Sequence, residues 1–154
     1  MRNVHKVAVV DGPTPSFAEG GHEPSFDHSR NNAGVLTELL RREPIFHRAE
    51  FGLERADFER MTASEFWEVG ASGRRYSRQF VIDSCVWRYE KPEAAHWEIQ
   101  DPHCLEIADG NYLMTYTLIQ GERVTRRSTI WRQTPDGWQI VFHQGTEVVN
   151  PDVT

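Results

Sequence analysis

The last third of the chain repeats one pattern, in which long segments rich in β-branched and aromatic residues alternate with short turns. The segments are residues 96–107, 112–120, 124–133 and 138–148. The turns between them are Asp-Gly-Asn at 109–111, Gly-Glu at 121–122 and Pro-Asp-Gly at 135–137. Such residues favour strands, and turns this short join neighbouring strands in antiparallel order. The sequence therefore predicts a four-stranded antiparallel meander.

Helical periodicity precedes the meander. Apolar and polar residues recur at spacings of three and four from Leu36 through Glu43 and His47 to Glu50, which predicts a first helix with one inward stripe. Pro44 interrupts the pattern, because proline lacks a backbone donor and crowds the preceding turn. We therefore expect a kink or a break at Pro44.

Two further helices and one strand are expected before the meander. A short helix at 56–61 would carry Phe58 and Met61 inward, and a strand at 66–69 would end at the turn residues of 70–73. Ser77 is a suitable N-cap for a third helix. That helix would present four residues on one side, namely Phe80, Val81, Ser84 and Cys85. Helices followed by a meander predict an α+β domain, with the helices on one face of the sheet.

The chain of 154 residues is long enough for one domain with its own core. Turn residues crowd the first 33 positions, so we expect an extended or disordered arm at 1–33 and the folded domain at 34–154. Cys85 and Cys104 show no metal or redox spacing and are expected to be buried thiols.

Composition excludes several classes of function. The net charge of −6 without a basic run disfavours a nucleic-acid partner. No apolar stretch is long enough to cross a membrane, and the first ten residues do not resemble a signal peptide, so the expected location is cytoplasmic. The sequence has no phosphate-binding glycine loop, dinucleotide fingerprint, G-x-S-x-G motif or zinc-like histidine spacing. We therefore expect no metal and no cofactor.

The order of these elements, together with three segments, resembles the nuclear transport factor 2-like superfamily. The segments are 65–73 (EFWEVGASG), 127–132 (RSTIWR) and 136–146 (DGWQIVFHQGT). Within the superfamily, the chain is similar to the SnoaL-like cyclases and to small bacterial domains of unknown function. The resemblance covers residues 35–148 and implies a cone-shaped curved antiparallel sheet capped by three N-terminal helices, a pocket between helices and sheet, and often a homodimer formed through the sheet. Relatives include isomerases, dehydratases, cyclases, epoxide hydrolases and proteins without catalysis, so no single activity is implied.

Two residues are candidates for acid–base catalysis. His47 could move protons near neutral pH if the first helix passes from the core to a pocket mouth; alternatively it bonds a backbone carbonyl or faces water. Glu68 precedes Gly70 much as the acidic base of ketosteroid-isomerase-like relatives precedes a glycine, although it could equally be a solvated strand residue. No tyrosine lies on the first helix and no acidic residue lies at the matching place in the meander, so steroid isomerisation itself is disfavoured.

Further residues are candidates for substrate binding. They are Glu43, Trp67, Tyr112, Tyr116, Arg127, Trp131 and Gln144. An arginine would hold a carboxylate or polarise a carbonyl, and a tyrosine would donate to an oxyanion. The alternative is that the aromatic residues fill the core and Arg127 forms a surface salt bridge. Gln144 continues the alternation of Trp138 and Ile140 and is expected on the apolar face, which would leave His143 facing solvent or a dimer partner.

Two functions fit these residues. The first is a cofactor-independent enzyme of the isomerase, dehydratase, cyclase or hydratase type that acts on a small organic substrate, and the second is a non-catalytic ligand-binding or dimeric assembly module. An enzyme pocket should bring at least two titratable groups to one ligand position, whereas a binding module should have one or none.

Overall fold

A computed structural model describes residues 24–25, 32–90 and 96–149 of the chain. Three α-helices and a 3-10 helix lie within the first 90 residues: α1 (Ala33–Leu40), η2 (Ala49–Phe51), α2 (Arg55–Met61) and α3 (Arg78–Glu90). The strands are β1 (Thr62–Val69), β2 (Arg75–Ser77), β3 (Glu98–Ala108), β4 (Asn111–Gln120), β5 (Arg123–Thr134) and β6 (Gly137–Glu147). Most of the arm expected at 1–33 falls outside the described residues. No helix in the described part of the chain is long and apolar enough to cross a membrane.

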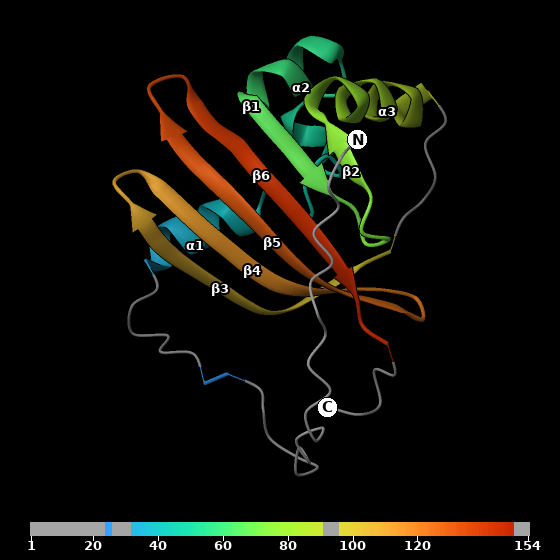
Figure 1. Cartoon of the computed structure of the whole chain (residues 1–154). Helices are drawn as coiled ribbons and strands as arrows, with labels where there is room; N and C mark the ends of the chain where they lie inside the picture. The colour runs from blue at the N-terminus through green and yellow to red at the C-terminus, as the bar shows by residue number, and fades with distance from the viewer. Residues whose placement is uncertain (1–23, 26–31, 91–95, 150–154) are drawn as a thin grey trace, which may run out of the picture.

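The strands form one curved sheet in the order β2-β1-β6-β5-β4-β3 (Figure 1). The predicted antiparallel meander of β3 to β6 is confirmed. The sheet as a whole is mixed, because β1 returns beside β6 in parallel orientation. The helices contact β1, β2, β3 and β6. The α+β architecture expected from the sequence is therefore correct.

Local sequence signals begin the helices. Asn32 caps α1 by accepting a hydrogen bond from the Val35 amide at 3.1 Å, and Glu54 and Asp57 form a capping box at α2. As predicted, Ser77 caps α3: its Oγ accepts from the Phe80 amide at 3.2 Å.

The first helix is shorter than its periodicity suggests. α1 ends at Leu40, before the cis Glu43–Pro44 peptide, so the break expected at Pro44 is confirmed. The stripe expected to run on to Glu50 is wrong, because the chain after Pro44 is irregular and Glu50 is exposed in η2. Tyr89 of α3 holds this irregular segment by donating a hydrogen bond to the Phe46 carbonyl at 2.6 Å.

The core lies on the sheet face that the helices cover. Tyr112, Met114, Tyr116 and Leu118 alternate inward along β4 and are all buried, as their shared face predicted. The predicted pair of buried thiols, Cys85 and Cys104, is also confirmed, and no disulfide joins them.

A bulge in β6 exchanges the two faces of that strand. Trp131 pairs with Ile140, but the neighbouring Ile130 pairs with Phe142, so one extra residue, Val141, stands between them. Beyond the bulge, His143 points inward and is only 3% exposed. The expectation that Gln144 lies on the apolar face and His143 faces solvent or a partner is therefore wrong.

A buried carboxylate joins the segment after α1 to the meander. Glu43 is fully buried, and its Oε2 accepts hydrogen bonds from the Tyr116 hydroxyl at 2.6 Å and the Ile45 amide at 3.0 Å. Its Oε1 accepts from the Trp131 indole at 3.0 Å. Burial raises the pKa of Glu43 despite these donors. The network connects the segment after α1 with β4 and β5 through one side chain.

We expect Glu43→Gln to lower the free energy of unfolding by about 2–4 kcal/mol. In either orientation, the amide NH2 of glutamine would face an N–H group that only donates, the Trp131 indole or the Ile45 amide. Tyr116→Phe removes one donor and should cost less, about 1–2 kcal/mol. Urea unfolding followed by tryptophan fluorescence measures both. A Glu43→Gln protein more stable than Tyr116→Phe would contradict this role.

Candidate functional site

A cavity of about 220 Å³ lies between the segment after α1, helix α3 and the ends of β1, β5 and β6. Its apolar wall includes Ile45, Phe46, Val69, Tyr76, Phe80 and Val81. Its polar lining residues are His47, Glu68, Ser84, Arg88, Arg127 and His143.

The strand register explains why three of the polar residues meet. Glu68 of β1 pairs with His143 of β6, and Arg127 of β5 pairs with Gly145 two residues further along β6. Paired residues in neighbouring strands point to the same face, so all three side chains enter the concave side. His47 and Arg88 approach from the segment after α1 and from α3.

Each histidine in the cavity accepts a hydrogen bond from an arginine. Nη1 of Arg88 lies 3.2 Å from Nε2 of His47, and Nη1 of Arg127 lies 3.3 Å from Nε2 of His143. Guanidinium nitrogens only donate, so both Nε2 atoms must be unprotonated acceptors. Nδ1 of His143, 2.9 Å from the Thr129 hydroxyl, then carries its proton.

Burial and the adjacent cations keep both histidines neutral. Burial first, and Arg88 and Arg127 second, lower the pKa of His47 to about 4. The same causes, burial and then Arg127, lower the pKa of His143 to about 3. The expectation that His47 titrates near neutral pH is therefore wrong, although its place in the cavity agrees with its selection as a site residue.

Glu68 is the acidic group of the cavity. Burial raises the pKa of its carboxyl group, and the charges of Arg127 and Arg88 only partly offset this effect. Trp67, its neighbour on β1, points to the opposite face of the sheet, as alternation predicts. A half-buried carboxylate with a raised pKa is a stronger base than a solvated one.

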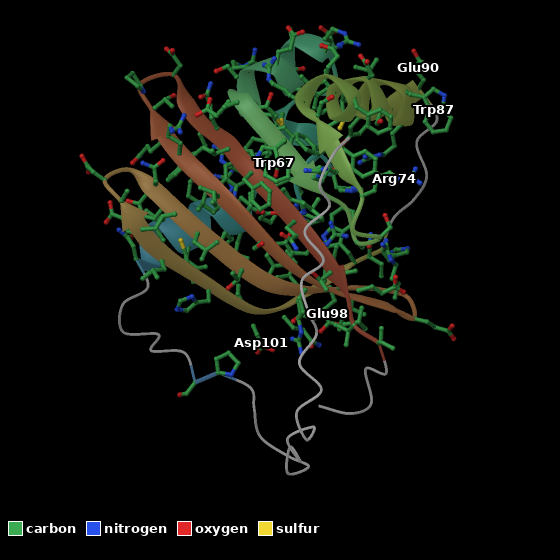
Figure 2. All side chains as sticks on the ribbon, viewed as in Figure 1. Trp67, Arg74, Trp87, Glu90, Glu98 and Asp101 are labelled. Atoms are coloured by element: carbon green, nitrogen blue, oxygen red, sulfur yellow. The ribbon has the colours of Figure 1, made fainter. Side chains whose placement is uncertain are left out.

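The other predicted substrate-binding residues lie elsewhere. Glu43, Tyr112 and Tyr116 belong to the buried core. Trp67 and Gln144 lie on the outer face of the sheet, where Trp67 is 43% exposed (Figure 2).

Trp131 lines a second cavity of about 220 Å³, bounded by α2, η2 and the β5–β6 turn. Its lining is largely aromatic and apolar, and ion pairs within the chain occupy two of its arginines: Arg42 with Glu38, and Arg60 with Asp57. The first cavity alone combines a carboxyl group of raised pKa with cations that have no carboxylate partner in the described part of the chain, so we take it as the candidate site.

Sequence reasoning missed Arg88 and His143. Arg88 follows Val81, Ser84 and Cys85 at helical spacing, so the inward face of α3 could have revealed it. His143 was hidden, because strict alternation along β6 gives the wrong face once a bulge intervenes.

Comparisons with known proteins identify the fold. No family model matches the chain, and no curated protein is similar to it in sequence. Among solved structures, a nuclear transport factor 2-like protein from Cytophaga hutchinsonii superposes with a TM-score of 0.58 at 10% identity, covering 77% of this chain and 99% of its own. One of the same kind from Rhodospirillum rubrum, described as of unknown function in nutrient uptake, gives 0.56 at 17% identity, with coverages of 75% and 98%.

A third structure, from Parabacteroides distasonis, is described as a suggested ketosteroid isomerase. It superposes with a TM-score of 0.55 at 14% identity, covering 82% of this chain and 95% of its own. At such identities the similarity establishes the fold and not the activity. The chain therefore has a nuclear transport factor 2-like fold.

Proposed function

We propose that the protein is a cofactor-independent acid–base enzyme that acts on a small organic molecule, with Glu68 as its general base. The supporting observation is the Glu68 carboxyl group, half-buried in a cavity, with a raised pKa and two guanidinium groups nearby. The reaction would be an isomerisation, dehydration, cyclisation or hydration, since all of these need a positioned base and stabilisation of a developing oxyanion.

The proposed chemistry assigns different tasks to the polar groups. Ionised Glu68 takes a proton from the substrate, and the electron pair that remains moves onto a substrate oxygen. A guanidinium group stabilises the negative charge on that oxygen. Because His47 accepts a hydrogen bond from Arg88 and stays neutral near pH 7, it acts as a positioning residue for Arg88 and not as a proton carrier.

Glu68→Gln removes the base and keeps its shape. We expect it to slow proton transfer by about 10²–10⁴-fold. The measurement is exchange of carbon-bound hydrogen for deuterium in D2O, followed by NMR with a panel of small ketones and keto acids. Glu65→Gln is the matched control, because Glu65 lies on the same strand but is exposed and pairs with Arg132 at 2.7 Å. Equal exchange rates in the two variants would remove Glu68 from the mechanism.

The raised pKa of Glu68 also predicts an effect on stability. A carboxyl group that holds its proton more tightly in the folded state stabilises the fold at low pH and loses that contribution as the pH rises through the folded pKa. Glu68→Gln should therefore raise the stability at pH 7. The gain should disappear below the ordinary pKa of 4.5. Thermal melts at several pH values test this; a variant less stable than the parent at pH 7 contradicts it.

A separate observation favours assembly as a homodimer through the sheet. On the outer face, register pairs connect one apolar row across five strands: Leu105, Leu113, Ile130, Phe142 and Trp67. The rings of Trp67 and Phe142 are 4.8 Å apart. Polar residues such as Thr115, Ser128 and Gln144 form the next row. An apolar centre with a polar margin is typical of a protein interface. This surface would serve an assembly module as well as an enzyme.

Trp67→Glu places a charge at the end of this row and should convert a dimer into a monomer. Sedimentation velocity measures the change. Trp87→Glu is the control, because Trp87 is exposed on α3, away from the row (Figure 2). A monomeric parent protein, or equal effects of the two substitutions, would contradict the proposed dimer.

A further inference from the structure

We infer that Arg88 and Arg127 form an anion subsite in this cavity, which holds the carboxylate of a small organic acid. The inference deepens the proposed function, on which it rests for the statement that the bound acid is the reacting molecule. The subsite itself can be tested by binding alone.

Arg127 is a half-buried cation whose partners are all neutral. Its Nε donates to the Thr125 hydroxyl at 2.9 Å, and its Nη1 donates to His143. The described residues provide no acceptor for Nη2 and no carboxylate within ion-pairing distance. A cation held away from water without a counterion is costly, so such groups in proteins are usually paired. Burial accordingly lowers the pKa of Arg127.

Arg88 repeats this arrangement from the other wall. It reaches the cavity from α3 and donates to a neutral histidine, His47. No carboxylate of the described chain pairs with it either. Each arginine thus donates one hydrogen bond to a neutral histidine, which orients the guanidinium group. The planar guanidinium group retains further N–H donors, whose geometry suits the two oxygens of a carboxylate.

Glu68 does not fill the place of the missing anion. Where glutamates of this chain do form ion pairs with arginines, as Glu38 does with Arg42 and Glu65 with Arg132, the pKa of the glutamate is lowered. The pKa of Glu68 is raised although two arginines share its cavity. Among the described residues, no ion pair joins Glu68 to either guanidinium group, in contrast to the pairs of Glu38 and Glu65. Both arginines therefore keep donors for an external anion.

Gly145 gives room to the Arg127 side chain. A Cβ atom at Gly145 would lie 3.3 Å from Nε and 3.4 Å from Cδ and Cζ of Arg127. The backbone conformation of Gly145 does not itself require glycine, because its φ is not in the left-handed region. The absence of a side chain therefore serves the close approach of the guanidinium group, as expected of a built site.

The cavity size and the apolar wall define the rest of the ligand. A volume of about 220 Å³ equals that of about seven water molecules at the roughly 30 Å³ that each occupies in the liquid. Covalently bonded atoms lie closer together than separate water molecules, so an acid of the size of benzoate fits this volume. Ile45, Phe46 and Val81 would contact its carbon skeleton. The subsite therefore fits a monocarboxylate with a short apolar or aromatic body.

Calorimetric titration with benzoate, and with benzamide as its uncharged isostere, tests the subsite in the full chain. Benzoate should bind with a Kd on the order of 1 mM, and benzamide about ten-fold or more weakly. Arg127→Met and Arg88→Met should each weaken benzoate binding by about ten-fold or more. Gly145→Ala should weaken it to a smaller extent. Arg126→Met is the control, because Arg126 lies next in sequence on the outer face; benzoate affinity should not change.

Glu68→Gln separates this inference from the proposed function. It should bind benzoate at least as tightly as the parent, because a competing negative charge is removed, while its proton exchange is lost. Equal affinity for benzoate and benzamide, no binding at about ten times the expected Kd, or unchanged affinity in both arginine variants would overturn the subsite. Inorganic phosphate binding in place of benzoate would also overturn it. If Glu68→Gln loses proton exchange but the parent protein does not bind benzoate, Glu68 remains the proposed base and only the anion subsite is contradicted.

Discussion

The buried carboxylate of Glu43 is the interaction on which the rest of the site depends. It lies where α1 has ended, and it accepts hydrogen bonds from Tyr116 of β4 and Trp131 of β5. The bond from the Ile45 amide fixes the next turn of chain against the same carboxylate. The chain therefore does not continue the helix here but lines the cavity with Ile45, Phe46 and His47. A fully buried carboxylate is costly, so this anchor works only because every donor around it is matched.

The cavity itself combines groups that would be unfavourable separately. Two guanidinium groups, two neutral histidines and one carboxyl group of raised pKa share a half-buried space. Their protonation states follow from one another: the cations help to keep the histidines neutral, and the neutral histidines can then accept the bonds that orient the cations. Such a cluster does little for stability, and groups with perturbed pKa values concentrate at functional sites. Its charge is best balanced by a ligand that brings a carboxylate.

The sequence predicted the architecture better than the site. Strand periodicity and glycine turns located β3 to β6 closely, and Ser77 marked the start of α3, because these signals are local. Glu68 and Arg127 were also found, since alternation places them reliably on regular strands. His143 was misplaced by a bulge that only the pairing of β5 with β6 reveals. The sequence predicts Glu43 and Tyr116 as ligand contacts, but they bind each other across 73 positions of sequence. Polarity on an inward face does not distinguish a pocket from a buried network.

The central claim is that Glu68 is a base because it is desolvated beside cations that do not fully compensate it. Carbon-13 NMR of the glutamate carboxyl groups, assigned by comparison with Glu68→Gln, measures its pKa directly. The account predicts a titration above 4.5 in the parent and a further rise in Arg127→Met, because Arg127 lowers this pKa. A Glu68 pKa at or below 4.5 would show a solvated or ion-paired carboxylate and would contradict the account.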